Sequence, residues 1–125
     1  MSQQQPSVLS AGAAVTTSAT AAASLANDGQ TFWFCSGFEI TGGGATAGGV
    51  VNATLSGVLG GPLVYKFPVP TGVTVAAAPL TVEFNPGLPA VSPTTDIVMT
   101  LLPLGAGNTG ASAVIHGYKG TRQLG

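Results

Sequence analysis

Residues 31–41, TFWFCSGFEIT, constrain the fold most because they gather large side chains in a chain made mainly of small ones. They hold the only Trp, three of the five Phe and the only Cys. The stretch alternates with a period of two, which is typical of a β-strand that buries one face. One parity, which we expect to face the core, holds Phe32, Phe34, Phe38 and Ile40. The other parity holds Trp33, Cys35, Glu39 and Thr41, and we expect Trp33 to serve packing rather than an exposed contact.

The size and charge of the chain favour a single domain that works inside an assembly. A chain of 125 residues can bury about two thirds of the surface that it exposes when unfolded. Three Lys plus Arg and four Asp plus Glu make up only 6% of the chain, whereas ordinary soluble domains carry about 25% charged residues. Because low net charge favours association, we interpret the chain as a component of a larger assembly.

The composition also excludes several partners. Three basic residues are too few for the basic stripe that nucleic-acid binding needs. No run reaches the roughly 18 uninterrupted apolar residues of a membrane span. The start, MSQQQP, lacks the basic region of a secretory signal. A single Cys permits no internal disulfide, so we expect folding in a reducing cytoplasm.

Residues 1–30 consist almost entirely of small side chains and predict an extended N-terminal arm. No capped helical stripe appears in them, and we expect a short strand around residues 9–17 with another before the turn at Asn27 to Gly29. The arm has little large apolar surface of its own. We therefore expect it to add a strand to a partner subunit; the alternative is an integral strand of its own domain's sheet.

The rest of the chain reads as short strands separated by Gly- and Pro-rich turns. Besides residues 31–41, the expected strands are 50–59, 63–69, 73–75, 80–84, 95–102 and 111–118. Pro68 predicts that strand 63–69 lies at a sheet edge. The Asn85-Pro86-Gly87 turn is expected to end strand 80–84. Because residues 95–102 are apolar on both parities, we expect a central strand buried on both faces.

This pattern predicts an all-β, single-domain antiparallel β-sandwich or jelly roll, with a partly open barrel as the competing fold. The domain would span residues 31–118, after the arm at 1–30 and before a polar C-terminal tail at 119–125.

The side chains that carry chemistry are few, and we predict no catalytic, cofactor or metal site and no enzymatic activity. Glu39 and Glu83 are the one carboxylate pair to consider for glycoside hydrolysis, but both lie on outward parities. We expect His116 to be a solvated or hydrogen-bonded surface group. One His and Cys35 do not make the ligand cluster that zinc requires. The remaining candidates are Asp28, Asp96, Lys66 and Lys119.

Two motif matches are weak. Gly42, Gly44 and Ala47 have the spacing of the dinucleotide fingerprint, but a strand rather than a helix is expected next. Asn52-Ala53-Thr54 matches the glycosylation sequon, yet no secretory signal precedes it.

A small, near-neutral β-sandwich with an Ala/Ser/Thr-rich N-terminal arm resembles the head decoration, or cement, proteins of tailed bacteriophages. The resemblance covers the whole chain in architecture and composition and rests on no single motif. It implies a non-enzymatic virion protein, made in the host cytoplasm, that binds the outer surface of an icosahedral head. It also implies two partners, the major capsid protein and further copies of the chain in a homodimer or homotrimer, so that capsomer contacts are stabilised.

Three alternatives remain. The first is a carbohydrate- or receptor-binding β-sandwich domain of a phage fibre or spike, which would use Trp33, Tyr65 or Tyr118, although all three fall within expected strands. The second is a pilus or surface-layer subunit, against which the missing signal counts. The third is an enzyme.

Overall fold

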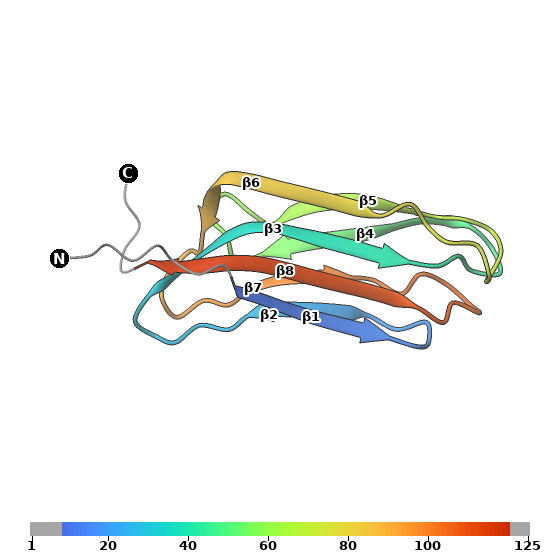
Figure 1. The fold of residues 1–125 in the computed structure, drawn as a ribbon, viewed down its shortest axis with the longest axis horizontal. Coiled ribbons are helices and arrows are strands. Elements are labelled where there is room, and N and C mark those ends of the chain that lie inside the picture. Colours follow the sequence, from blue (N-terminus) through green and yellow to red (C-terminus); the bar gives the residue numbers. More distant parts are fainter. Residues whose placement is uncertain (1–8, 121–125) are drawn as a thin grey trace.

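The computed structural model describes residues 9–120, which form eight strands and no helix. The strands are β1 (Leu9–Val15), β2 (Ala21–Leu25), β3 (Phe32–Gly42), β4 (Gly49–Ser56), β5 (Leu63–Val69), β6 (Leu80–Pro89), β7 (Ile97–Leu101) and β8 (Ala111–Gly120). They build two four-stranded antiparallel sheets, sheet A in the order β1-β8-β3-β6 and sheet B in the order β2-β7-β4-β5 (Figure 1). The predicted all-β, sandwich-like fold is confirmed.

The strands pair in a nested pattern. β1 pairs with β8, β2 with β7, β3 with β6 and β4 with β5, so that the numbers of these partners always add to nine. The chain therefore runs as one long antiparallel hairpin whose halves, β1 to β4 and β5 to β8, lie side by side. Only β4 and β5 are consecutive strands of the same sheet. All other connections cross between the sheets at one end of the sandwich or the other (Figure 1).

The core lies between the two sheets and is filled from both. In β7 the side chains of Ile97, Met99 and Leu101 are fully buried, while the two residues between them are partly exposed. The predicted central position of this strand is confirmed, but only one of its faces is buried. The largest fully buried side chains are Phe38, Phe67, Ile40, Leu55, Ile97, Met99, Leu101, Ile115, Val58 and Cys35.

A β-bulge in β3 changes which parity faces the core. The register shifts between Cys35 and Gly37 against both neighbouring strands, so one extra residue is inserted and the alternation restarts. Before the bulge Trp33 and Cys35 are buried, at 5% and 0% exposure; after it Phe38 and Ile40 are buried, both at 0%. The packing role predicted for Trp33 is confirmed.

The prediction of one inward Phe face is therefore wrong for the first half of β3. Phe32 and Phe34 are only half-buried, and Phe34 stacks on Tyr118 with ring centroids 5.2 Å apart. The physical reason is that a period-two pattern assumes an unbroken ladder, whereas the bulge moves every later side chain to the opposite face.

The small-residue N-terminal segment forms strands of the chain's own sheets. β1 pairs with β8 and β2 with β7, and Ala21, Ala23 and Leu25 of β2 belong to the core. The expectation that this segment pairs with a partner rather than with its own sheets is wrong for residues 9–25. Small side chains are sufficient there because each strand lies at a sheet edge and adds to a core built mainly by its neighbours. Residues 1–8 of the expected arm and residues 121–125 of the expected tail lie outside the described residues.

Two further boundaries differ from expectation. Residues 73–75 form no strand but belong to the connection between β5 and β6, where Val73 and Val75 are 44% and 45% exposed. β6 does not end at residues 85–87 but continues to Pro89, because those residues take up the irregular register opposite the bulge of β3. The edge position of β5, predicted from Pro68, is confirmed.

Candidate functional site

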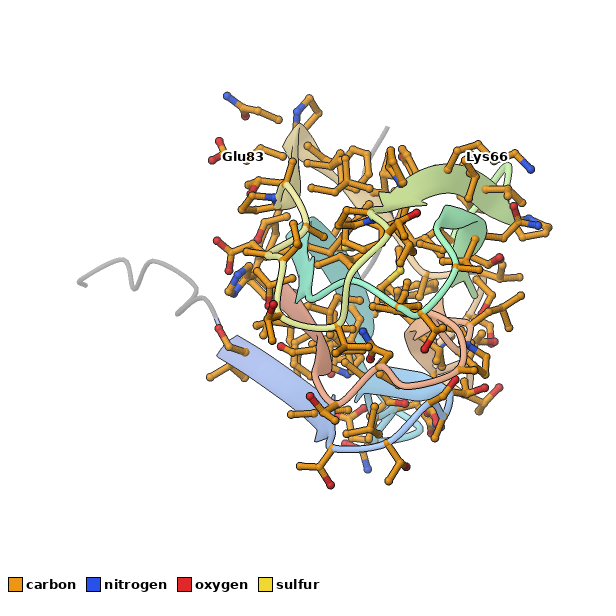
Figure 2. The ribbon with its side chains drawn as sticks, turned by 90° about the vertical axis from the view of Figure 1, so that its right-hand side faces the viewer. Lys66 and Glu83 are labelled. Atoms are coloured by element: carbon orange, nitrogen blue, oxygen red, sulfur yellow. The ribbon has the colours of Figure 1, made fainter. Side chains whose placement is uncertain are left out.

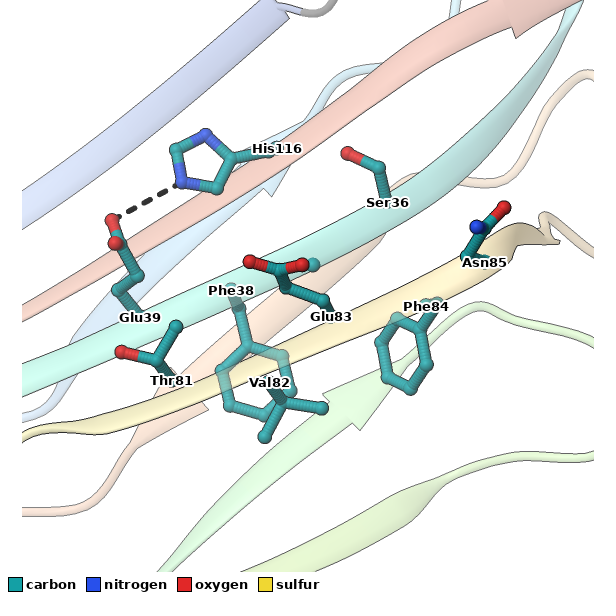
Figure 3. A pocket seen from close by; sticks show the side chains of 10 residues that line it. Ser36, Phe38, Glu39, Thr81, Val82, Glu83, Phe84, Asn85 and His116 are labelled. Carbon is teal, nitrogen blue, oxygen red and sulfur yellow. Dashed lines mark hydrogen bonds and ion pairs between the residues drawn. The ribbon is translucent and has the colours of Figure 1, made fainter.

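His116 joins three strands on the outer face of sheet A. Its Nε2 lies 3.2 Å from Oε1 of Glu39 on β3 (Figure 3). Its Nδ1 lies 2.6 Å from Oγ of Ser10 on β1. The imidazole, on β8 between them, is a hydrogen-bonded surface group, as predicted. These three residue types also occur in hydrolase triads, but there the serine bonds Nε2 and the carboxylate bonds Nδ1. The present arrangement has the opposite order and ties the edge strand β1 to the middle of the sheet.

Glu39 and Glu83 share one shallow hollow on this face. Glu39 pairs in register with Thr81, and Glu83 lies two residues farther along β6. The hollow has a volume of about 390 Å³ and is lined by Ser36, Gly37, Phe38, Glu39, Thr81, Val82, Glu83, Phe84, Asn85 and His116 (Figure 3). The sequence does not indicate that the two carboxylates lie close together. They do so because of the register in which β3 pairs with β6. Both are exposed, so neither has the apolar surroundings that keep a glycosidase acid protonated.

Gly37 forms the floor of the hollow because no side chain fits there. A Cβ at this position would meet the backbone oxygen of Val82 at 2.5 Å, a distance that real Cβ atoms do not reach. The close approach of β6 to β3 at the bulge therefore requires glycine.

Cys35 is buried and is not a candidate nucleophile. The side chain has 0% exposure and its Sγ donates to the backbone oxygen of Gly37 at 3.6 Å. Burial raises the pKa of the thiol to about 11, so almost none of it is thiolate at neutral pH.

Two carboxylates stabilise turns at the end of the sandwich where β1 begins and β8 ends. The Asp28 carboxylate accepts hydrogen bonds from the backbone N–H of Thr31 and Gln30 and from the Thr31 hydroxyl, and these bonds hold its pKa well below the usual range. Asp96 accepts from the backbone and side-chain amides of Asn27, which also lower its pKa. These are structural roles.

The basic side chains of the described residues have local partners too. Lys119 lies 3.4 Å from Asp28 and 5.0 Å from the centre of the Trp33 ring. Lys66 donates to Oδ1 of Asn52 at 2.7 Å, so the amide of the sequon is already engaged.

The aromatic residues considered for sugar binding are largely used in packing. Trp33 is buried and its Nε1–H donates to the backbone oxygen of Ala26 at 2.7 Å. Tyr65 packs edge-on against Phe38 at 5.0 Å, and burial raises its pKa. Tyr118, half-buried, stacks on Phe34. Each of the three rings thus takes part in packing within the sandwich.

The end of the sandwich where β1 ends and β8 begins, which we call the loop end, is uncharged. It is formed by residues 16–20, 43–48, 70–79 and 102–110. The charged residues of the described part, Asp28, Glu39, Lys66, Glu83, Asp96 and Lys119, all lie elsewhere. Figure 2, viewed from this end, shows Lys66 and Glu83 pointing toward opposite sides of the sandwich.

Apolar side chains are exposed on and beside the loop end. Val73 and Val75 are 44% and 45% exposed, and Leu102 is 43% exposed. Val50, at the start of β4 next to this end, is 62% exposed. Sequence reasoning missed this surface because Val73 and Val75 look like residues of a strand, in which both would point to the same face and could be buried together.

The loops of the loop end are held together by backbone hydrogen bonds. Asn108 is buried at 3% exposure, and its Nδ2 donates to the backbone oxygens of Gly43 and Gly44, both at 2.9 Å. The loop of residues 43–48 also pairs with its neighbours through Ala45 N–H to Pro70 O at 3.1 Å and Thr46 N–H to Ala106 O at 2.8 Å. The glycine-rich residues 42–49 therefore form a loop between two strands, as expected from the strand pattern after them. Their backbone groups take part in this hydrogen-bond network.

No match to the chain was found among protein-family models, curated proteins or solved structures. Within residues 9–120, no group of three or more His, Cys, Asp or Glu side chains is placed to hold a metal ion. A helix long and apolar enough to cross a membrane is likewise absent from this part of the chain.

Proposed function

We propose that the chain is a non-enzymatic virion structural protein, a capsid decoration protein that binds the outer surface of an icosahedral phage head. Its partners are the major capsid protein and a second copy of itself, and its location is the capsid surface after synthesis in the host cytoplasm. The observation that carries the proposal is the loop end, a surface without charged residues that exposes Val73, Val75 and Leu102.

The chemistry of the loop end suits contact with another protein. The centres of protein interfaces are depleted in charged residues, and contiguous exposed apolar surface marks interaction sites. Carboxylates and basic groups buried in a contact cost free energy unless they are paired, and this end has none to bury. A protein bound to a shell in many identical copies gains from such a contact because its affinity does not depend on charge matching.

The loop end is also preorganised. Loops that order only on binding lose conformational entropy at that moment and weaken the contact. Here Asn108 and the backbone hydrogen bonds between neighbouring loops hold the surface in place before binding. Rigid presentation fits a protein that stabilises contacts between capsomers.

The nested pairing of strands supports assignment of the fold as a jelly roll, which we propose as the finer description. A jelly roll is a double-sheet fold of eight strands that occurs in viral capsid and lectin domains. The sheet orders β1-β8-β3-β6 and β2-β7-β4-β5 are what results when one long antiparallel hairpin is rolled into two layers. Because one fold can host several functions, the fold is consistent with the viral assignment, but the proposal rests on the loop end.

Binding to heads tests the proposal. Undecorated heads of the source phage are mixed with the purified chain, and the amount that cosediments with them is measured. We expect saturable binding by the wild type. The double variant Val73→Asp, Val75→Asp, which places two carboxylates on the loop end, should lose binding by tenfold or more, since burial of each unpaired charge costs several kcal/mol.

The matched control is Val91→Asp at the opposite end of the sandwich, where Val91 is 52% exposed. It introduces the same chemical change and should bind like the wild type. Absence of wild-type binding would overturn the proposed function. Equal losses for both variants would overturn the assignment of the loop end.

The hollow on sheet A supports one alternative function, that of a carbohydrate-binding domain of a phage fibre or spike. Its hydroxyl, amide and carboxylate groups from Ser36, Thr81, Asn85 and the two glutamates are of the kind that bind sugar hydroxyls. A glycan-array signal that Glu83→Gln abolishes would favour this function over capsid decoration.

A further inference from the structure

The two open sides of the sandwich differ in how their edge strands are protected. β5 and β6 lie at one side and β1 and β2 at the other (Figure 1). β5 carries Lys66 and Pro68, and β6 carries Glu83, Pro86 and Pro89. Charges and prolines are the features by which natural edge strands avoid pairing with another chain. Residues 9–26, which span β1 and β2, contain no charge and no proline, so this side lacks such protection.

We propose that β1 is the contact between two copies of the chain, pairing antiparallel with β1 of a second copy about a two-fold axis at Gly12. The contact would join the two copies of sheet A into one continuous sheet. The inference rests on the homo-oligomer of the proposed function, and it specifies a dimer and the strand that makes it.

Backbone groups are available for this pairing. In a β-strand alternate N–H and C=O groups point to opposite sides, and β1 has β8 on one side only. Among residues 9–120, no strand pairs with the groups on its other side. Without proline in Leu9–Val15, every second residue can donate and accept across the new contact.

The sequence of β1 is self-complementary about Gly12. In the two-fold register Leu9 faces Val15, Ser10 faces Ala14 and Ala11 faces Ala13. Residues of equal parity meet, so the inward face of one copy continues as the inward face of the other. A register displaced by one residue would place apolar residues of one copy beside outward ones of the other.

Leu9 supplies a second, independent observation. It shares the inward parity of Ala11 and Ala13, yet it is 46% exposed on a strand that, among residues 9–120, is the edge of its sheet. An apolar side chain that faces the core layer but remains uncovered is what a missing neighbouring strand would leave. In the proposed dimer, Val15 of the second copy covers it.

A second copy fits this edge better than a chain of different sequence. In a two-fold contact only residues close to the axis lie near their own copies, so any charge there would meet a like charge. β1 is free of charges, and its outward residues Ser10, Gly12 and Ala14 are small, which leaves room for two identical strands.

Introducing charged side chains at Gly12 tests the proposal. A Cβ at Gly12 would lie 3.5 Å from Cγ2 of Val114 and 3.7 Å from the nearest backbone atom, so a side chain fits in the single chain. Gly12→Lys and Gly12→Glu each place two like charges opposite one another, which disfavours pairing across strands. We expect light scattering to give twice the chain mass of 12.2 kDa for the wild type and the mass of one chain for each variant alone.

An equimolar mixture of the two variants should regain the dimer, because Lys then faces Glu. This rescue excludes misfolding as the cause of dissociation. Val64→Lys on β5, where Val64 is 53% exposed, is the matched control and should stay dimeric. In addition, Gly12→Cys should form a disulfide-linked dimer under mild oxidation, while the buried Cys35 does not react.

A monomeric or trimeric wild type, unchanged dimers of both charged variants, or a mixture that stays monomeric would overturn the proposal. These measurements use the isolated chain and no heads. A dimer that fails to bind heads would therefore refute the proposed function alone, and a monomer that binds heads would refute the β1 contact alone.

Discussion

At the scale of single residues, the bulge at Ser36 and Gly37 decides which side chains of β3 stabilise the fold. It makes Trp33 a core residue and leaves Phe34 on the outer face against Tyr118. Residue identity alone would rank the two aromatic side chains as equals.

Alanine substitution should separate them. Trp33→Ala removes a buried side chain and its hydrogen bond to Ala26, and should lower the free energy of unfolding by about 3 to 5 kcal/mol. Phe34→Ala removes a half-buried ring and should cost about 1 to 2 kcal/mol. Denaturation in guanidinium chloride measures both. A larger loss for Phe34→Ala would mean that the bulge is misplaced.

Gly37 gives a second prediction at this scale. Gly37→Ala forces a Cβ against the backbone of Val82 and should cost about 1 to 3 kcal/mol. At Gly49, by contrast, an added Cβ meets nothing within 4 Å, so Gly49→Ala should be neutral or stabilising by up to about 1 kcal/mol. Thermal unfolding of the pair provides the measurement, and equal midpoints would contradict the close approach of β6 to β3.

Asp28 predicts how stability depends on pH. Hydrogen bonds from Thr31 and Gln30 lower its pKa in the folded state, while the unfolded value is about 3.9. The stabilisation is therefore present above the unfolded value and is lost as the pH falls through it toward the folded one. We expect the melting temperature to fall between about pH 5 and pH 2. Asp28→Asn should melt lower at pH 7 and show a weaker fall; an unchanged pH profile would argue against this turn.

At the scale of strands, β1 and β2 are integral to the sandwich although their side chains are small. Ala21, Ala23 and Leu25 fill the core over β7, and β1 covers the edge of β8. Burial by edge strands depends on their backbone pairing as much as on side-chain volume.

Deletion of residues 1–26 should therefore abolish folding. It removes both strands, exposes the edges of β7 and β8 and opens the core, and exposed unprotected edges promote aggregation. We expect insoluble or unfolded product, assessed by expression and far-UV circular dichroism. A soluble truncated chain with the wild-type spectrum and melting temperature would show that β1 and β2 are dispensable.

At the scale of the whole molecule, charge is kept away from both proposed contacts. The loop end and the β1 edge are uncharged, whereas the acidic and basic groups of residues 9–120 lie on sheet faces and at the opposite end.

Association should consequently depend little on salt. Raising NaCl from about 0.1 M to about 1 M shortens the Debye length from about 10 Å to about 3 Å, but neither contact has charges to screen. We expect the dissociation constants for the dimer and for head binding to change by less than about threefold. Analytical ultracentrifugation and cosedimentation provide them. A tenfold weakening in high salt would show that charged residues carry the contacts.

Much of the architecture was predictable because period-two patterns survive wherever the ladder is regular. β4 and β5 follow the expected parities, and β4, β5, β7 and β8 lie close to the expected bounds. What could not be predicted depends on pairing between distant segments. The bulge of β3, the joining of Glu39 with Glu83 and the exposure of Val73 and Val75 all arise from neighbours that the local sequence does not specify.

The nested pairing has a consequence for synthesis of the chain. β1 pairs with β8, and Ser10 contacts His116 across 106 positions of sequence. Strand β1 therefore leaves the ribosome well before the strand with which it pairs has been synthesised. Translation adds about 5 to 20 residues per second, which leaves β1 and β2 unpaired for several seconds in each nascent chain. Large β-branched or aromatic residues there would invite premature association between neighbouring polysomal chains. The small side chains that make up most of β1 offer little apolar surface for such association before β8 is made.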